Sequence, residues 1–130
     1  QYQWFKNVLS RSTEKWIIVV GHHPIISAGI SHGNTPELEK LIKPLLEAYD
    51  VDFYLSGHDH HFEHSNEAPG ETEYIVTGTG GTTRPIRYTL QTLYAASEIG
   101  FTQMSVTRDD IVLQFIDMYG RGKYLYRRSK

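Results

Sequence analysis

The hydrophobic and polar positions along the chain predict short elements of alternating type. In residues 2–9 the apolar side chains recur at a helical period, with polar residues on the opposite side, and this pattern predicts an amphipathic helix. Residues 16–20 form a continuous, largely β-branched run closed by Gly21, which is typical of a strand buried on both faces of a sheet. Residues 52–56 repeat this pattern and end at Gly57. The first half of the chain therefore predicts two buried strands.

The segment between these strands predicts a loop followed by a helix. Residues 22–34 hold a proline and two glycines without a sustained period, as loops do. Thr35 and Pro36 suit the N-cap and first turn of a helix, and a stripe of leucines follows them. Pro44 should kink this helix because its ring disrupts the helical backbone. The order strand, loop, helix, strand predicts a βαβ unit with parallel strands.

The second half of the chain predicts a mostly β structure. Further strands are expected at 74–77, 101–107 and 111–117, the last two as an antiparallel hairpin. Residues 63–73 are interpreted as a polar excursion, and residues 88–96 fit either a loop or a helix. The basic end of the chain, residues 127–130, is expected to be a solvated tail.

Composition limits the classes of function. A length of 130 residues suits one domain, and 39% hydrophobic with 22% charged residues is typical of a packed globular protein. The net charge of −2 argues against a nucleic-acid partner or binding to a membrane surface. No apolar run approaches the roughly 20 residues that span a bilayer, so no membrane span is expected. With no cysteine, any metal must be held by histidine and oxygen ligands.

All seven histidines lie between His22 and His64. Two groups, at 21–24 (Gly-His-His-Pro) and 57–61 (Gly-His-Asp-His-His), each follow a predicted strand directly. Because parallel strands end at the same edge of a sheet, where ligands bind in open α/β folds, we expect the two groups to converge. If the backbone is extended there, His58 and His60 share one side.

These residues predict a metal site without selecting the ion. Imidazole binds zinc, iron, manganese, nickel and copper. A glycine before each histidine is expected to allow the sharp turn and the close approach of backbone to an ion. Neutral imidazoles cannot offset two metal cations, so carboxylates are required, and Asp59 alone does not supply enough of them.

The two groups resemble the last two motifs of the calcineurin-like metallophosphoesterases. The tartrate-resistant, or purple, acid phosphatase branch has Gly-His-Tyr-Pro followed by Gly-His-Asp-His-Asn. The resemblance extends over nearly the whole chain. Its implied fold class is α/β, as the C-terminal half of the four-layer α/β/β/α metallophosphoesterase sandwich, a mixed sheet with flanking helices.

The resemblance implies a role for each histidine of the motifs. His22 and His58 would bind a divalent metal, and His60 would bind the first metal, usually ferric iron, so the implied cofactors are two metal ions, iron with a divalent iron, zinc or manganese. His32 would orient the substrate ester or protonate the leaving oxygen. His23 and His61, which replace the Tyr and Asn of the branch, are also expected to bind the substrate, through contacts that differ from those of the branch.

The family's first three motifs, which supply the bridging carboxylate and a metal-binding Asn, are not found in this sequence. Residues 1–130 thus resemble the C-terminal part of the catalytic domain, which would be inactive alone and would need an N-terminal half as partner. The implied function is hydrolysis of phosphomonoesters at a dinuclear metal site. Two alternatives stay open, namely a non-catalytic scaffold or interaction protein and a phosphodiesterase. Only the resemblance suggests a secreted or lysosomal-like compartment.

Three remaining groups receive structural interpretations. His64 is expected at the surface, and Arg84 and Arg87 are expected to be solvated loop charges rather than contacts for an anionic substrate. The glycine-rich run 78–81 could cradle phosphate through backbone amides, although a tight exit from a strand explains it better.

Overall fold

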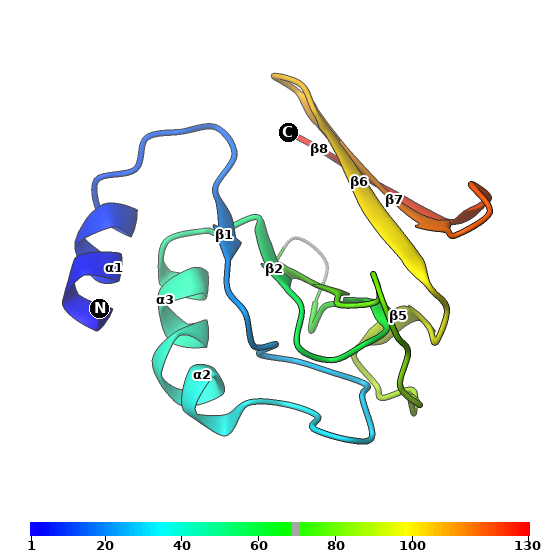
Figure 1. Ribbon diagram of the computed structural model, residues 1–130. Coiled ribbons are helices and arrows are strands. Elements are labelled where there is room, and N and C mark those ends of the chain that lie inside the picture. Colours follow the sequence, from blue (N-terminus) through cyan, green and yellow to red (C-terminus); the bar gives the residue numbers. More distant parts are fainter. Residues whose placement is uncertain (69–70) are drawn as a thin grey trace.

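A computed structural model describes residues 1–68 and 71–130 of the chain. Three helices lie on one side of a five-stranded sheet, and a three-stranded sheet lies on the other side (Figure 1). The helices are α1 (Tyr2–Leu9), α2 (Pro36–Leu41) and α3 (Lys43–Ala48). The strands are β1 (Ile18–Val20), β2 (Phe53–Ser56), β3 (Phe62–Ser65), β4 (Glu73–Thr77), β5 (Thr92–Ala96), β6 (Gly100–Val106), β7 (Asp110–Asp117) and β8 (Gly122–Ser129).

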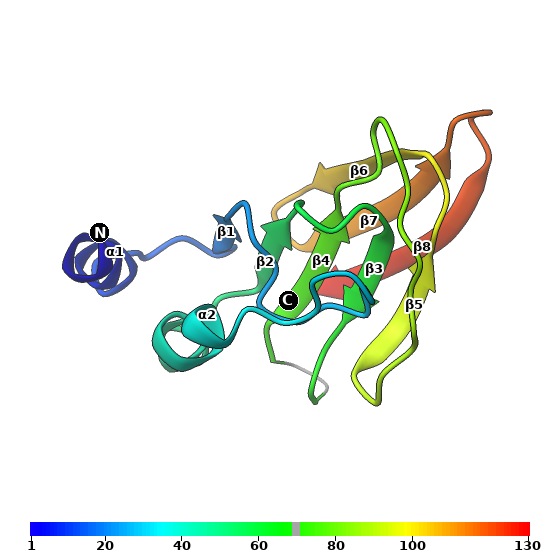
Figure 2. The same cartoon turned by 60° about the horizontal axis from the view of Figure 1, so that its bottom comes forward.

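The first sheet is mixed and has the order β1-β2-β4-β3-β5 (Figure 2). Strands β1, β2 and β4 are parallel, whereas β3 is antiparallel to both β4 and β5. The second sheet is an antiparallel meander of β6, β7 and β8. This architecture, an α/β fold with a mixed sheet and flanking helices, agrees with the fold class expected from the sequence.

Two separate cores lie on opposite faces of the five-stranded sheet. Along β2 and β4, Tyr54 and Tyr74 face the helices, while Phe53 and Ile75 face the second sheet. This alternation is the period of two expected of a strand that is buried on both faces. The core between the sheets consists of the buried side chains of Phe53, Phe62, Ile75, Ile111, Leu113 and Phe115.

Several predicted elements are confirmed. The amphipathic helix at 2–9, the parallel pairing of β1 with β2, and the hairpin β6–β7 all form as expected. The predicted kink also forms, because α2 ends at Leu41 and α3, with Pro44 in its first turn, begins at Lys43. The βαβ unit is therefore correct in order and direction.

Other predictions are wrong. The segment 63–73 contains β3 and the start of β4; both are fully buried, and residues 69–70 lie outside the described part. Residues 92–96 form a strand, neither a loop nor a helix, and residues 127–130 are no solvated tail because β8 runs to Ser129. β1 is not buried on both faces, since it pairs only with β2 and leaves Val20 75% exposed.

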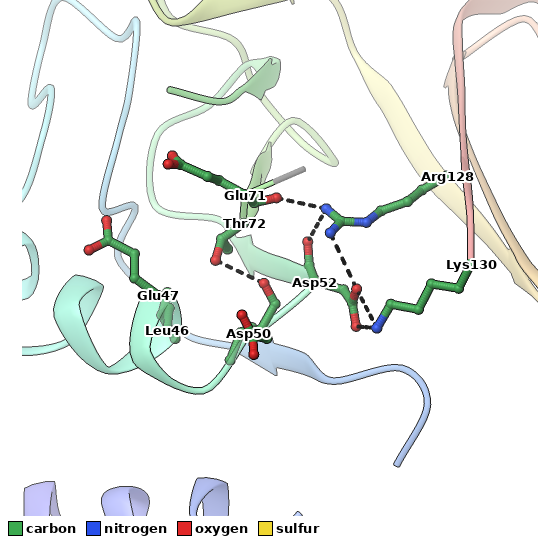
Figure 3. A pocket seen from close by; sticks show the side chains of 9 residues that line it. Leu46, Glu47, Asp50, Asp52, Glu71, Thr72, Arg128 and Lys130 are labelled. Carbon is green, nitrogen blue, oxygen red and sulfur yellow. Dashed lines mark hydrogen bonds and ion pairs between the residues drawn. The ribbon is translucent and has the colours of Figure 1, made fainter. Parts of the chain in front are cut away.

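A pocket of about 290 Å³ lies at the amino ends of β2 and β4, whereas the histidine motifs follow the carboxyl ends of β1 and β2. Figure 3 shows the residues that line this pocket. The buried carboxylate of Asp52, just before β2, lies in this pocket between two cationic side chains. One is Arg128 of β8 and the other is Lys130, which follows that strand. The Lys130 ammonium is 2.8 Å from both of its oxygens, and the Arg128 guanidinium is 3.5 Å from one. Asp52 also accepts a hydrogen bond from the backbone nitrogen of Ile17, at 2.9 Å. These contacts tie β8 to the first sheet.

Candidate functional site

The two histidine-bearing segments are held side by side where β1 and β2 end. The ladder between these strands continues past Val20, because the backbone nitrogen of Gly21 donates to the Leu55 carbonyl at 3.0 Å and that of Gly57 donates to the His22 carbonyl at 3.1 Å. The parallel pairing expected from the βαβ pattern therefore delivers both segments to one edge of the sheet.

Three histidines form one cluster at this edge. His22, His23 and His58 each offer a ring nitrogen, and these atoms lie within 4.8 Å of one another. The closest pair is Nδ1 of His58 and Nε2 of His22, at 3.3 Å. The His23 ring lies 4.2 Å from the His58 ring, and the His32 ring lies 4.5 Å from it, measured between ring centroids. Both His22 and His23 are exposed, so the cluster is open to solvent.

The spacing of His22 and His58 fits two ligands of a single ion. Metal–nitrogen bonds of about 2.0–2.1 Å at a tetrahedral angle place the two nitrogens about 3.3 Å apart. Neutral imidazoles are required for this role. Partial burial of the His58 ring, together with the neighbouring imidazoles, lowers the pKa of His58 despite the opposite effect of Asp59. The residues present thus match the donor set of a transition-metal site.

The backbone at the second motif departs from the expected extended form. His58 has φ of +62°, in the left-handed region that non-glycine residues rarely adopt, and the backbone nitrogen of Asp59 donates to the Gly57 carbonyl at 2.7 Å. The chain therefore turns tightly at His58, between Gly57 and Asp59. Strained backbone of this kind is concentrated at functional sites because the surrounding structure must hold it in place.

The structure gives a packing reason for the glycine at position 21 and none for the glycine at position 57. A Cβ at Gly21 would collide with the hydroxyl of Tyr54, whereas a Cβ at Gly57 meets no atom closer than 3.9 Å. Neither residue has positive φ. At Gly78 a Cβ would collide with the Asp59 carbonyl, so the glycine-rich segment after β4 begins as a tight strand exit beneath the second motif.

The structure does not bring His60 and His61 into the three-histidine cluster. His60 is half-buried, and its Nδ1 atom is buried without a hydrogen-bond partner in the described chain. His61 is fully buried, and its Nε2 atom lies 2.8 Å from the Glu63 carboxylate. Because that carboxylate only accepts hydrogen bonds, His61 carries its proton on Nε2. The side chain of His61 thus points into the protein.

His32 lies beside the cluster and contacts Arg84, a residue expected from the sequence to be a solvated loop charge. Its Nε2 atom is 2.6 Å from the guanidinium of Arg84, which is half-buried. The expectation that Arg84 is a solvated loop charge is wrong, because the 82–87 segment folds back over the second motif. Arg87, by contrast, is exposed.

Two buried carboxylates attach the loop that carries His32 to the second motif. The Ser27 hydroxyl donates to Asp59, and the Ala28 backbone nitrogen donates to Glu63 at 2.6 Å. Asp59 and Glu63 are at most 1% exposed. One oxygen of Asp59 therefore binds the loop, while its Oδ1 atom is buried without a hydrogen-bond partner among the described residues. The roles of Asp59 and Glu63 were missed from the sequence, because both stand in a largely polar segment that gives no signal of their burial.

His64 is another misassigned histidine. Rather than lying at the surface, it is fully buried between the sheets, where its Nδ1 atom is 2.9 Å from the Tyr124 hydroxyl and its Nε2 atom is 2.8 Å from Glu73. Tyr126 donates a hydrogen bond to the same carboxylate at 2.5 Å. His64 thus belongs to the contact between the sheets and lies outside the histidine cluster.

The part of the chain that carries the histidine cluster is similar to known proteins. The model of the calcineurin-like phosphoesterase family matches residues 1–62, which include both histidine motifs. The chain belongs to the calcineurin-like phosphoesterases. Purple acid phosphatase 4 of Arabidopsis thaliana is 37% identical to this phosphoesterase chain over 126 residues, covering 94% of the chain and 37% of the relative. Tartrate-resistant acid phosphatase type 5 of Rattus norvegicus is 31% identical, covering 99% and 41%.

Solved structures agree on the fold of this phosphoesterase chain. GAP50, described as the anchor in the inner membrane complex of Plasmodium, matches 98% of the chain and 41% of its own with a TM-score of 0.91 and 28% identity. The purple acid phosphatase PPD1 from yellow lupin seeds matches 99% of the chain and 28% of its own, with a TM-score of 0.89 and 17% identity. The chain thus spans about two fifths or less of these proteins.

Proposed function

We propose that this chain supplies the histidine ligands of a dinuclear metal site in a phosphatase that hydrolyses phosphomonoesters. The observation that carries the proposal is the 3.3 Å approach of His58 Nδ1 to His22 Nε2 at the ends of two parallel strands. Membership of the phosphoesterase family supports the reaction class, and the purple acid phosphatase relatives support the substrate class. The 130 residues would form the C-terminal part of the catalytic domain.

The proposed metal ligands are His22, His58 and His60, and the proposed ions are iron with a divalent iron, zinc or manganese. When bound, such ions supply positive charge that lowers the pKa of water and neutralises phosphoryl oxygens. The backbone that carries the His22 imidazole is held in place because the Gly57 nitrogen donates a hydrogen bond to the His22 carbonyl. The strained backbone at His58 turns its ring toward His22.

The proposed catalytic residue is His32, which donates a proton or a hydrogen bond to the leaving oxygen. Its ring lies 4.5 Å from that of His58, close enough for one phosphate to reach both. His23, at 4.2 Å from the His58 ring and exposed, is a proposed substrate contact. His61 is proposed to influence substrate binding only indirectly, by positioning the adjoining residues of its motif, because its own ring is buried against Glu63.

The remaining ligands are proposed to come from an N-terminal half of the same fold. Neutral imidazoles leave most of the charge of two cations unbalanced, and one of the two Asp59 oxygens already accepts a hydrogen bond from the Ser27 hydroxyl. The open edge at β1 supports this partner, because Val20 is 75% exposed and Trp4, on the adjacent helix, is 67% exposed. Apolar side chains exposed together in this way mark an interaction surface.

Substitution of one metal ligand tests the proposal. In the full-length protein, His58→Ala should abolish hydrolysis of an aryl phosphate and remove about one metal ion per molecule, measured by elemental analysis, while the circular dichroism spectrum stays unchanged. Exposed Arg87→Ala is the control and should keep both. Normal metal content and turnover in His58→Ala would overturn the assignment. Comparing mono-aryl with bis-aryl phosphate distinguishes a phosphatase from a phosphodiesterase.

A non-catalytic anchor is the second candidate function. It is favoured by the similarity to GAP50, whose description names it as an anchor and which has the same fold over this region at 28% identity. In that case the full-length protein would retain the sandwich without binding two metal ions. Metal analysis of the wild-type protein therefore separates the two candidates before any activity is measured.

A further inference from the structure

Arg84 is fixed against the second histidine motif by its backbone. The residue lies in the connection between β4 and β5, where its nitrogen donates to the His60 carbonyl and its own carbonyl accepts a hydrogen bond from the Ser97 hydroxyl, both at 2.8 Å. These two hydrogen bonds anchor the backbone on either side of the Arg84 Cα atom. The backbone of the second histidine motif thus fixes the position from which the Arg84 side chain extends, unlike that of a side chain on a mobile surface loop.

The guanidinium of Arg84 contacts an imidazole and carries an unbalanced charge. Its Nη1 atom lies 2.6 Å from His32 Nε2. Within residues 1–68 and 71–130, no carboxylate lies within ion-pair distance of it, whereas the guanidiniums of Arg121 and Arg127 each pair with an aspartate. A half-buried cation without a carboxylate, next to a cluster of imidazoles, favours the binding of an anion.

We propose that Arg84 is a substrate-binding residue that holds the phosphate group over the histidine cluster, and that it also orients His32. This inference rests on the proposed function and adds a residue to it. A guanidinium has five N–H donors and no acceptor, so His32 Nε2 must accept its hydrogen bond. The proton of the neutral His32 ring then lies on Nδ1, the nitrogen that remains to donate to an ester oxygen.

The chemistry of Arg84 also points to the class of substrate. Only one of the five N–H groups is used by His32, and the planar fork of the others suits two phosphoryl oxygens. A phosphomonoester near neutral pH carries close to two negative charges, whereas a diester carries one. A fixed cation at the mouth of the site therefore favours monoesters over diesters.

Phosphate affinity tests this inference separately from turnover. Inorganic phosphate is titrated by calorimetry into the full-length protein, with its metal content measured beforehand, as wild type, Arg84→Ala, Arg84→Lys and Arg87→Ala. Arg84→Ala should weaken phosphate binding by about 10-fold to 100-fold, as expected for loss of a hydrogen bond to a charged group. Arg84→Lys should recover part of this loss. Arg87→Ala removes the same charge from an exposed position and should leave the affinity within about twofold of wild type.

The outcomes distinguish the two proposals. Weaker phosphate binding in Arg84→Ala supports the inference even if the wild-type protein proves to be a non-catalytic anchor. Equal binding in Arg84→Ala and Arg87→Ala overturns it, and so does a wild-type protein that binds no phosphate, whatever the effect of His58→Ala on turnover. Where turnover is measurable, Arg84→Ala should raise KM for an aryl monophosphate more than it lowers kcat, and should reduce the preference for monoesters over diesters.

The orientation of His32 provides a second measurement. Long-range proton–nitrogen NMR correlations of the imidazole should show the Nδ1–H tautomer for His32 in the wild-type protein and in Arg87→Ala. In Arg84→Ala the Nε2–H tautomer, the more stable form of a free imidazole, should appear. An Nε2–H tautomer in the wild type would contradict the contact on which the positioning role depends.

Discussion

The Glu63 carboxylate accepts a hydrogen bond from the backbone nitrogen of Ala28, with 2.6 Å between N and Oε2. The two residues belong to the two different histidine segments. The same carboxylate also contacts His61 at 2.8 Å and accepts a hydrogen bond from the Ser65 hydroxyl. The backbone nitrogen of Ala28, the imidazole of His61 and the hydroxyl of Ser65 all present a donor, so the site requires a group that only accepts.

Glu63→Gln should therefore destabilise the protein even though it preserves volume. The amide NH₂ would face a donor, leaving at least one buried polar group unpaired, and we expect the free energy of unfolding to fall by about 1–3 kcal/mol. Urea denaturation measures the change. Hydrogen exchange at the Ala28 amide should accelerate as well, because its acceptor is weakened.

Glu14→Gln is the matched control, since Glu14 is exposed in the connection that follows α1. Its stability should stay within about 0.5 kcal/mol of wild type. If Glu63→Gln were as stable as Glu14→Gln, the buried carboxylate would not hold the loop that carries His32.

Gly21 and Gly57 should differ in their response to alanine although both precede a histidine. A Cβ at Gly21 overlaps the Tyr54 hydroxyl, so Gly21→Ala should cost about 1–3 kcal/mol of stability. Gly57→Ala finds open space and should cost less than about 1 kcal/mol. Thermal unfolding measures both variants.

A double variant identifies the collision. Tyr54→Phe removes the oxygen that blocks the Cβ, so Gly21→Ala combined with Tyr54→Phe should be less destabilised than the sum of the single variants. Additive effects would mean that the Tyr54 hydroxyl is not the obstacle, which would leave the aromatic ring, whose Cζ atom lies 2.9 Å from the Cβ position.

Asp52 should contribute more to stability than a carboxylate in an exposed ion pair. Its side chain is 1% exposed and faces Lys130, Arg128 and the backbone nitrogen of Ile17 (Figure 3). Removing one partner of a buried, hydrogen-bonded pair is costly, and Asp52→Ala should lower the free energy of unfolding by about 3 kcal/mol.

The Lys15–Asp109 pair provides the comparison, because both side chains are well exposed. Asp109→Ala should change stability by no more than about 1 kcal/mol in the same urea titration. Equal effects of Asp52→Ala and Asp109→Ala would show that β8 is not held by Asp52.

Stability should fall in acid partly because of Glu73. Burial alone would raise the pKa of Glu73, but hydrogen bonds from His64 and Tyr126 outweigh it and hold the pKa below its usual 4.5. In the unfolded chain Glu73 titrates near that ordinary value, so between the two pKa values the unfolded state binds more protons. The contribution of Glu73 is therefore present above pH 4.5 and is lost as the pH falls through the folded pKa.

Tyr126→Phe tests this linkage. Without the phenol, the pKa of Glu73 in the folded protein rises, so the variant should be less stable at pH 7 and should lose less of its remaining stability between pH 5 and pH 3. Urea denaturation at each pH measures both effects. A constant difference between wild type and Tyr126→Phe across this range would contradict the role assigned to Glu73.

The fold was predictable from the sequence where burial follows the hydrophobic pattern. Residues 53–56 form a strand surrounded by other elements, and their pattern identified them correctly. The strand β3 was missed because Glu63 and His64 look polar, yet each is buried in a hydrogen-bonded pair that the sequence does not reveal. β8 was missed for a similar reason, since Arg128 pairs with Glu73 on β4 and with Asp52 just before β2, both far away in the sequence.

The sequence was sufficient to predict which two strand ends carry the candidate site. Parallel pairing brings His22 and His58 together, as expected, and His23 and His32 join them. The sequence could not reveal the left-handed turn at His58 or the burial of His61, because both depend on contacts with distant loops. Arg84 was undervalued because its place beside His32 depends on how residues 82–87 return to the second motif, 52 positions away from His32.

The shared carboxylate of Glu73 also specifies the alignment of the last strand. Tyr124, Tyr126 and Arg128 alternate along β8 and face the first sheet, with Tyr126 opposite Leu113 on β7. A shift of β8 by one position would turn Leu125 and Arg127 inward and leave Glu73 and His64 without their phenols. The buried Glu73 carboxylate thus favours one register of β8. A strand in the wrong register would lose several hydrogen bonds at once, so the two sheets pack in a single alignment.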